Sequence, residues 1–377
     1  MKDRCAPRTR VNLLTYMRRG EGERLFCSRP FRWFEVASQS EEGKGTTFLC
    51  CPSWLKKPIG NLLQSSVEEI WNGPAAADIR RSILDGSFEY CNRARCPWLH
   101  SKSGPVQRIE QLDDPLMRRA IDENLTILPW GPTEVIACYD ASCNLSCPSC
   151  RTDVIMEHGQ RDSILTIQGK IEREALKTAR MLHITGSGDP FGSPYFRKWL
   201  QTMKRADMPV LERIHLQTNG LLWTKRTWQS IPEEIRSLVR DADISIDAAT
   251  AATYAINRRG GNFERLLDNL EFISSELRPN GPLERIGISM VVQRNNFREM
   301  SDFIRLGKRF NLDTVYFSQL VNWGTFTVEE YQKRAIHIPT HAEHQQFVQL
   351  MRDPIFDDPA VYLGNLTSVR QEALELA

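Results

Sequence analysis

The part of the sequence from about residue 133 to residue 325 alternates short apolar runs with amphipathic segments, and this alternation constrains the fold more than any other feature. Such runs predict buried strands, and the segments between them predict helices that pack on a parallel sheet. The expected strands are Glu134–Tyr139, Arg180–Thr185, Arg213–Gln217, Asp243–Ile246, Ile286–Val292 and Thr314–Phe317. The expected helices include Ile167–Ala179, Phe196–Arg205, Glu264–Leu277 and Arg298–Phe310. Six units are too few for a closed eight-stranded barrel, so we expect an α/β fold with an open, partial (β/α)6 barrel.

The preceding hundred residues follow a different pattern. Strands at Phe31–Ser38 and Thr46–Cys50 are expected to form a hairpin, and short helices and a cysteine-bearing loop follow them. We therefore expect a small α+β cysteine-rich module at residues 1–100 and a linker with one helix at 101–132. The barrel would occupy residues 133–325, and residues 326–377 would form a C-terminal tail without an assigned role.

Composition excludes several classes of function. The chain has 49 Lys and Arg against 47 Asp and Glu, a net charge of +2, which gives no reason to expect nucleic acid or a membrane surface as a partner. No apolar run is long enough for a signal peptide or a membrane span. The default expectation is a cytoplasmic, reducing location, where the 10 cysteines are more often metal ligands than disulfides.

Three of these cysteines follow the first strand of the predicted barrel. Cys143, Cys147 and Cys150 have the spacing C-x3-C-x2-C on one loop, where their thiolates can converge on a single metal centre. A structural zinc site needs four ligands, whereas an iron–sulfur cluster held by three cysteines leaves one iron open. The alternative is a zinc knuckle that uses Cys138 as its fourth ligand, but Cys138 lies within a rigid strand.

This motif resembles the signature of the radical S-adenosylmethionine (SAM) superfamily, and further motifs follow at the ends of successive strands. The resemblance spans about 190 residues and implies a 4Fe–4S cluster held by the three cysteines, with SAM bound beside it. It implies SAM contacts at Gly186, Ser187, Gly188, Asp189, Gln217, Asn219, Ser245, Asp247, Arg258 and Gln293. The chain departs from the family at Ser149, where an aromatic residue often packs on the adenine.

The segment Gly186–Gly192 has a second interpretation, because it also follows a predicted strand. It could form a dinucleotide-binding turn, which holds phosphate on backbone amides. Asp189 within the segment would repel a pyrophosphate and suits an ammonium group such as that of SAM. Taken singly, Gln217, Asn219, Ser245 and Asp247 could equally cap strand ends, and Arg258 could be a solvated cation.

The N-terminal module resembles the SPASM or twitch module that carries auxiliary clusters in many radical SAM enzymes. The similarity rests on Gly45-x4-Cys50 on a hairpin and on a segment that leads from Pro58 through Trp71 to a cysteine pair. It implies one auxiliary 4Fe–4S cluster, with the ligands Cys27, Cys50, Cys91 and Cys96. Cys51 could replace Cys50, and a zinc ribbon with four cysteine ligands is the alternative. The module usually follows the barrel, whereas here it precedes it.

The remaining chemical groups predict less. Cys5 is expected to be an unpaired surface thiol, and Cys51 and Cys138 to be packed small residues rather than hydrogen donors to a radical. His337, His341 and His344 cannot share one regular helix because Pro339 lies among them. We expect that segment to be solvated rather than to bind metal.

The resemblance implies reductive cleavage of SAM to a 5′-deoxyadenosyl radical, which abstracts hydrogen from a substrate C–H bond. The auxiliary cluster would handle the electron of the substrate radical, giving oxidation, epimerisation or bond formation. A small-molecule or sugar-containing substrate is favoured over a peptide, and a flavodoxin or ferredoxin would supply electrons. A zinc-stabilised scaffold and a nicotinamide oxidoreductase are the alternatives. The sequence identifies no catalytic acid, base or hydrogen donor.

Overall fold

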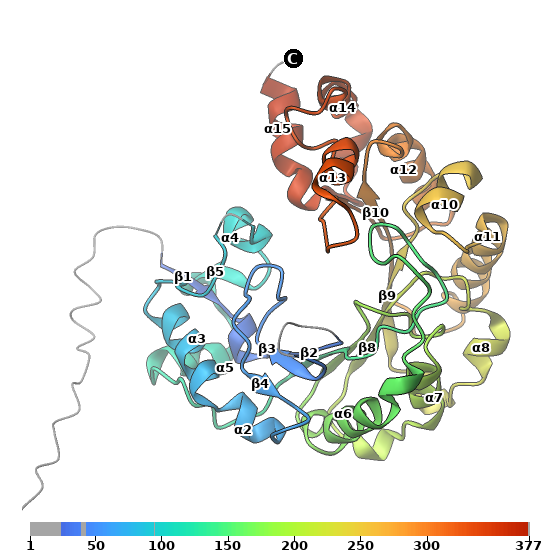
Figure 1. Ribbon diagram of the computed structural model, residues 1–377. Helices are drawn as coiled ribbons and strands as arrows, with labels where there is room; N and C mark the ends of the chain where they lie inside the picture. The colour runs from blue at the N-terminus through green and yellow to red at the C-terminus, as the bar shows by residue number, and fades with distance from the viewer. Residues whose placement is uncertain (1–23, 39–42, 94, 376–377) are drawn as a thin grey trace, which may run out of the picture.

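The computed structural model describes residues 24–38, 43–93 and 95–375. Residues 1–23, which include Cys5, lie outside this part of the chain. One curved sheet of ten strands organises the molecule, and helices cover its convex side (Figure 1). In spatial order the strands are β12 Val361–Tyr362, β11 Thr314–Gln319, β10 Arg285–Val292, β9 Val239–Ser245, β8 Arg213–Thr218, β7 Met181–Ile184, β6 Glu134–Cys138, β2 Trp33–Ala37, β3 Thr46–Phe48 and β4 Gly60–Asn61.

The six strands from β6 to β11 are parallel and follow one another in chain order, so the predicted partial (β/α)6 barrel is confirmed. The helices of this part are α6 Arg161–Arg173, α7 Pro194–Thr202, α8 Lys225–Gln229, α9 Glu233–Arg236, α10 Ala251–Asn257, α11 Phe263–Glu271 and α12 Met300–Arg309. A π-helical turn, Phe272–Leu277, continues α11 and completes the helix that the sequence predicts there. Side-chain caps at Ser193, Thr250 and Asn262 explain where α7, α10 and α11 begin.

The N-terminal module shares the sheet of the barrel. Strand β2 pairs in parallel with β6, and β3 and β4 extend the edge in antiparallel fashion. The rest of the module comprises β1 Leu25–Cys27, α2 Val67–Trp71, α3 Pro74–Leu84 and α4 Pro97–Ser101, and the linker contains β5 Val106–Arg108 and α5 Pro115–Asp122. Strands β1 and β5 pair antiparallel, and Ser66 and Glu69 form the capping box of α2. The sequence predicts β2, β3, the two short helices that follow them and the helix of the linker, but it does not predict β1, β4, β5, α4 or the shared sheet.

The C-terminal tail is folded onto the barrel. It contains α13 Val328–Arg334, α14 His344–Leu350 and α15 Thr367–Glu375, and β12 adds a parallel strand beside β11. The solvated segment predicted around the histidines does not hold for His344, whose side chain is buried and whose Nδ1 lies 2.9 Å from the Ile336 carbonyl oxygen.

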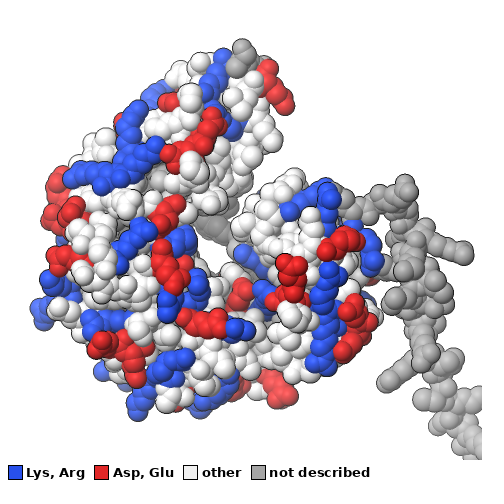
Figure 2. Space-filling view, turned by 180° about the vertical axis from the view of Figure 1, so that it is seen from behind, with Lys and Arg blue, Asp and Glu red and all other residues white. Residues whose placement is uncertain are grey.

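Charge is distributed evenly on the face seen in Figure 2, where acidic and basic side chains are interspersed. The same view shows a hollow between the N-terminal module and the C-terminal helices. Within the described residues, no helix combines the length and apolar character needed to cross a membrane.

Candidate functional site

The three predicted core cysteines lie on the loop that follows β6. Backbone hydrogen bonds shape this loop: Cys143 N donates to the Ile155 carbonyl at 2.9 Å, and Ser146 N donates to the Arg259 carbonyl at 3.1 Å. Cys150 N donates to the Cys147 carbonyl at 2.9 Å, which forms a tight turn. Cys143 and Cys147 are buried and Cys150 is exposed. The loop therefore presents its three thiols at the carboxyl end of the sheet, where parallel α/β folds place their chemistry.

Each of the three sulfurs faces one nitrogen donor. Asn219 Nδ2 lies 3.6 Å from Cys143 Sγ, and Arg258 Nη1 lies 3.7 Å from Cys147 Sγ. Arg151 Nη2 lies 3.4 Å from Cys150 Sγ. Two cationic side chains and one amide suit three anionic sulfurs better than three neutral thiols. The sequence predicts Asn219 and Arg258 near this site, and Arg151 could have been suspected because it directly follows Cys150.

The side chain of Glu157 links the cysteine loop to the N-terminal module by hydrogen bonds. Its carboxylate accepts hydrogen bonds from Ala141 N at 3.0 Å and from Lys44 Nζ at 2.7 Å. Its own backbone N–H donates to Ser142 Oγ at 3.0 Å. Lys44 Nζ also donates to the Tyr139 carbonyl at 3.0 Å. Sequence reasoning gave no role to Lys44 or Glu157, because they lie far apart in the chain and belong to no motif.

The segment after β7 is a tight turn closed by its own side chain. Thr185 Oγ1 accepts hydrogen bonds from the backbone N–H groups of Gly186, Ser187 and Gly188, at 2.6, 3.1 and 2.9 Å. A phosphate-binding turn needs such amides free to face an anion. These three amides already have a partner, which argues against the dinucleotide interpretation.

Position 188 of this turn requires glycine because there is no room for a side chain. A Cβ on Gly188 would lie 2.5 Å from the Asp140 carbonyl oxygen and 2.7 Å from that of Ser142. The turn and the start of the cysteine loop therefore pack backbone against backbone. Ser187 Oγ adds a 2.7 Å hydrogen bond to the Cys138 carbonyl.

Asp189 is held by four hydrogen bonds within the protein. Its Oδ1 accepts from Phe191 N at 3.0 Å and Gly192 N at 2.7 Å. Its Oδ2 accepts from Thr218 Oγ1 and Asn219 N, both at 2.8 Å. A carboxylate offers about four acceptor positions, so Asp189 ties its loop to the end of β8. Contact with an ammonium group, as the sequence predicts, would compete with these bonds.

Asp247 and Arg258 form a buried ion pair beside the cysteine loop. Arg258 Nη2 lies 2.8 Å from Asp247 Oδ2, and Val291 N donates to Asp247 Oδ1 at 2.7 Å. Burial raises the pKa of Asp247, and the charge of Arg258 opposes this rise. The buried Gln293 Oε1 has no hydrogen-bond partner in the described structure, which leaves an acceptor for a ligand. Ser245, the last residue of β9, accepts a hydrogen bond at its Oγ from Ser289 Oγ at 3.3 Å.

The second predicted cysteine set gathers in the N-terminal module. The thiol of Cys27 interacts electrostatically with those of Cys50 and Cys91, and the thiol of Cys91 with that of Cys96. Cys50 Sγ accepts from Trp54 Nε1 at 3.2 Å and from Arg29 Nη1 at 3.7 Å. The guanidinium of Arg29 stacks 4.1 Å above the ring of Trp33, which fixes its direction. The guanidinium of Arg29 thus lies beside the thiols of Cys50 and Cys27.

Cys51 lies apart from this set. Its thiol donates to Ser53 Oγ at 3.3 Å and interacts with the carboxyl of Glu35 and with Cys138. The thiol of Cys50 interacts with those of both Cys27 and Cys91. These interactions favour Cys50 over Cys51 as a candidate ligand.

Both cysteine sets fit iron–sulfur clusters by the chemistry of their donors. Burial raises the pKa of Cys143 to about 11 and that of Cys91 to about 12, and such thiols lose their protons when they bind metal. Among the described residues, no group of three or more Cys, His, Asp or Glu side chains is arranged so that it could hold a metal ion. The fit rests on the sulfurs and on the N–H groups directed at them.

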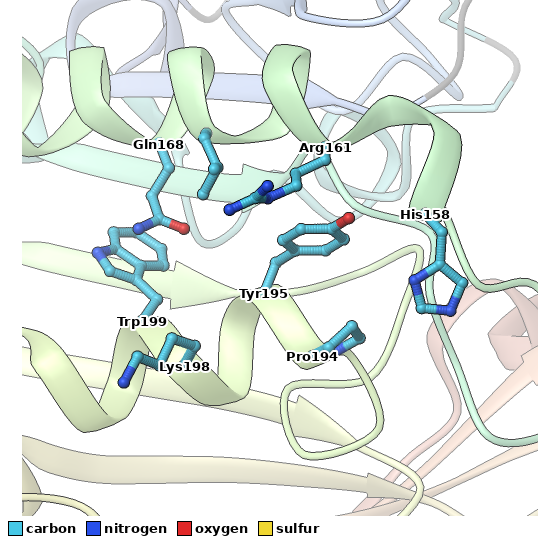
Figure 3. A pocket seen from close by; sticks show the side chains of 8 residues that line it. His158, Arg161, Gln168, Pro194, Tyr195, Lys198 and Trp199 are labelled. Atoms are coloured by element: carbon cyan, nitrogen blue, oxygen red, sulfur yellow. The ribbon is translucent and has the colours of Figure 1, made fainter.

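A cavity of about 380 Å³ lies elsewhere, in the helical layer between α6 and α7. In Figure 3 the ring of Tyr195 and the guanidinium of Arg161 lie alongside each other, with Trp199 and Gln168 at one end. No cysteine lines this cavity. We therefore do not assign the chemistry of the strand ends to it.

Family comparisons agree with these two sites. Residues 141–307 match the radical SAM superfamily, and residues 27–97 match the SPASM iron-sulfur cluster-binding domain. A radical SAM domain implies a 4Fe–4S cluster and SAM, and a SPASM domain implies auxiliary iron–sulfur clusters. No curated protein matches the sequence.

Solved structures show a distant likeness. SuiB of Streptococcus suis, bound to the precursor peptide SuiA, is 12% identical with a TM-score of 0.42, over 81% of this chain and 66% of SuiB. The protein anSMEcpe, with bound AdoMet and a peptide, is 16% identical with a TM-score of 0.38, over 60% of this chain and 62% of its own. TYW1, with a lysine–pyruvate adduct bound, is 16% identical with a TM-score of 0.35, over 59% of this chain and 71% of TYW1. This chain thus spans less than two thirds of the length of SuiB and of anSMEcpe.

Proposed function

Because the chain carries a radical SAM domain with a SPASM domain N-terminal to it, we propose that it is an enzyme that cleaves SAM reductively and abstracts hydrogen from a substrate C–H bond. When bound, the cluster and SAM supply the electron transfer and the 5′-deoxyadenosyl radical that such chemistry needs. The protein's own side chains hold these groups, orient the substrate and limit the access of water.

The observation that carries the proposal is the set of nitrogen donors around the core cysteines. Cys143, Cys147 and Cys150 supply three thiolates, which leaves one iron of a 4Fe–4S cluster open for another ligand. Hydrogen bonds to the sulfurs of a cluster stabilise its negative charge. Arg151 and Arg258 direct two positive charges at this site. A zinc knuckle would lack its fourth ligand here, since the Cys138 side chain lies against Gly186.

The SAM contacts would come from the strand ends that surround this loop. Gly186, Ser187 and Gly188 form a turn beside the cysteine loop, and the carbonyl oxygens of Gly186 and Gly188 suit the ammonium of SAM. The Ser187 carbonyl oxygen already accepts a hydrogen bond from Arg151. Arg258, held by Asp247, suits its carboxylate, and the unpartnered Gln293 Oε1 suits an amino group of the adenine. Asp189 would support this site by holding the loop, and Asn219 by orienting Cys143.

An auxiliary 4Fe–4S cluster would lie in the N-terminal module, on Cys27, Cys50, Cys91 and Cys96. With four protein ligands it would have no iron open to substrate. Arg29 and Trp54 donate to Cys50, which would favour the more reduced, more negative state of the cluster. We infer that it takes up an electron from the substrate radical, in an oxidation, an epimerisation or a bond-forming reaction.

The partners are a substrate and an external electron donor, such as a flavodoxin or ferredoxin. A small-molecule or sugar-containing substrate is the first proposal. A peptide is the second candidate, because SuiB and anSMEcpe are solved with bound peptides.

The test is anaerobic reconstitution with iron and sulfide, followed by reduction in the presence of SAM. We expect a brown protein that produces 5′-deoxyadenosine, and we expect Cys147→Ser to abolish that product. His158→Gln, an exposed change outside the site, is the control and should leave production unchanged. A colourless protein that binds zinc and does not cleave SAM would instead support a zinc-stabilised scaffold.

A further inference from the structure

The inner face of the barrel sheet is unusually polar. Strands of parallel sheets that are covered on both faces are apolar at nearly every position, but on β8 apolar and polar residues alternate. On β8, Ile214 and Leu216 are fully buried, while the intervening His215 and the following Gln217 are polar. On β10 and β11, Ile288 and Val315 face the helix α12, because a Cβ on Gly307 of that helix would touch both. The polar set therefore faces the concave side of the sheet.

Four of these polar side chains form one group, which we call the inner-face array: His183, His215, Gln217 and Asp243. The imidazole rings of His183 and His215 are 4.2 Å apart between centroids. His183 Nε2 lies 3.3 Å from Gln217 Oε1. His215 Nε2 is buried and lies 3.4 Å from Asp243 Oδ2 without the geometry of a hydrogen bond. His183 also has a hydrogen bond with the backbone of Thr185, so the ring nitrogen of the array without a hydrogen-bond partner among the described residues is His215 Nε2.

The array continues directly from the turn that we propose contacts SAM. A Cβ placed on Gly186 would lie 3.7 Å from Gln217 Oε1 and 3.0 Å from Cys138 Sγ. No side chain separates Gly186 from the array at this point. A group bound to the array would therefore lie next to the proposed site of hydrogen abstraction.

The array carries little net charge. Burial lowers the pKa of His183 to about 3 and that of His215 to about 4, so both rings are neutral at pH 7. A neutral imidazole has one donor and one acceptor, and an amide has both. Asp243 is the charged member, and Arg285 neutralises it with contacts of 3.0 and 3.2 Å.

The cations at the base of the sheet are already paired. Arg213 Nη1 lies 2.8 Å from Asp241 Oδ2, and Arg285 Nε lies 3.6 Å from Asp241 Oδ1. Two guanidiniums thus face two carboxylates, Asp241 and Asp243. A phosphate or carboxylate on a ligand would have to displace one of these carboxylates.

We propose that the inner-face array is a substrate subsite that binds an uncharged, multiply hydroxylated group, such as a sugar ring. A hydroxyl both donates and accepts, so vicinal hydroxyls match adjacent imidazole and amide groups. An apolar side chain bound there would leave these buried polar groups unpaired, which is costly. Tyr316 on β11 stands on the same face with its side chain partly exposed and offers a further hydroxyl. This inference rests on the proposed function, since it names the substrate class of that site.

The experiment measures binding to the reconstituted holoenzyme in the presence of SAM, by calorimetry. The probes are a methyl hexoside, glucose 6-phosphate and a capped alanine tripeptide. We expect the methyl hexoside to bind more tightly than the other two. His215→Phe should weaken its binding by about tenfold or more, because a buried hydrogen-bonding ring is lost.

Three controls separate this result from damage to the protein. The SAM affinity and iron content of His215→Phe should stay within about twofold of the wild-type values. His158→Phe, an exposed change on the helical layer, should bind the hexoside normally. Tyr316→Phe removes only one hydroxyl and serves if His215→Phe does not fold; we expect it to weaken binding by about threefold to tenfold.

The proposal is overturned if the hexoside does not bind, if the phosphate or the tripeptide binds more tightly, or if His158→Phe weakens binding as much as His215→Phe. Failure of the proposed function is a separate result. In that case the protein after reconstitution would hold no iron or would not cleave SAM. Failure of this inference alone would leave the iron content and the SAM cleavage intact.

Discussion

Lys44 Nζ lies 2.7 Å from Glu157 Oε2, and both side chains are about nine-tenths buried. Lys44 precedes β3 of the N-terminal module, and Glu157 lies at the end of the loop that carries Cys143, Cys147 and Cys150. The two cysteine sites are therefore joined by an ion pair as well as by the pairing of β2 with β6. Relative movement of the two sites would break both, so we infer that the distance between them is fixed.

Replacing Lys44 should destabilise this junction. Lys44→Met leaves the Glu157 carboxylate buried with only Ala141 N as a donor, and loss of one partner of a buried pair costs about 3 kcal/mol. Urea unfolding measures the change. Lys225→Met removes an exposed ion pair with Glu276 and should cost about 0.5 kcal/mol. Equal losses of unfolding free energy in the two variants would mean that the ion pair between Lys44 and Glu157 stabilises the protein no more than an exposed ion pair does.

Gly188→Ala should disturb the turn beside the cysteines. The added methyl would meet two backbone carbonyl oxygens at 2.5 and 2.7 Å, and backbone cannot move aside as a side chain does. We expect a loss of about 1–3 kcal/mol in unfolding free energy and weaker SAM binding. Gly159→Ala adds a methyl where nothing lies within 4 Å and should leave both values unchanged. A normal SAM affinity in Gly188→Ala would argue against this turn as a SAM contact.

Asp189→Asn tests whether Asp189 supports the loop or binds SAM directly. The amide keeps the size of the carboxylate, but its NH2 group faces two N–H or O–H donors instead of accepting from them. We expect the SAM-free protein to lose about 2–4 kcal/mol of stability. If Asp189 only supports the loop, SAM affinity falls modestly and the thermal shift on SAM addition persists. A stable protein that no longer binds SAM would instead identify Asp189 as a direct contact.

The two adjacent cysteines of the N-terminal module, Cys50 and Cys51, should respond differently to substitution. Cys50→Ser removes the thiol that faces Arg29 and Cys27, so we expect loss of one cluster's iron while SAM cleavage to 5′-deoxyadenosine persists. Cys51→Ser removes a thiol that faces Glu35 and Ser53 and should retain full iron. Iron analysis and electron paramagnetic resonance of the reduced proteins measure both. The reverse pattern would assign Cys51 as the ligand.

The sequence predicts those features of the structure that depend on residues close together in the chain. Strand and helix periodicity places all six barrel strands, because each is set by neighbouring residues. Val239–Ser245 begins four residues before the predicted Asp243, since polar inner-face residues interrupt the apolar run. The shared sheet, the tie between Lys44 and Glu157, and the fold of the tail depend on contacts between distant segments, for which one sequence gives no signal. The role of Arg29 at Cys50 likewise emerges only when the loops are folded, whereas the position of Arg151 directly after Cys150 is a local signal.

The buried histidines His183 and His215 predict a dependence of stability on pH. Burial lowers both pKa values, and the neighbouring His215 lowers that of His183 further, to about 3, against about 6.5 in the unfolded chain. For His215, Asp243 partly offsets burial while Arg285 adds to it, and the pKa is about 4. Because the unfolded state binds more protons than the folded state below pH 6.5, acidification from there toward pH 4 should destabilise the protein.

The slope approaches about 1.4 kcal/mol per pH unit for each histidine. Burial raises the pKa of Glu35 to about 7. Its titration therefore acts in the opposite sense and stabilises the folded protein as the pH falls. The comparison must therefore be made between variants rather than on the wild type alone. His183→Gln keeps a polar side chain beside Gln217 and removes one titrating ring, so urea unfolding across this pH range should show a shallower loss. A loss as steep as that of the wild type would mean that His183 is protonated in the folded state, and the neutral character assigned to the inner-face array would then be wrong.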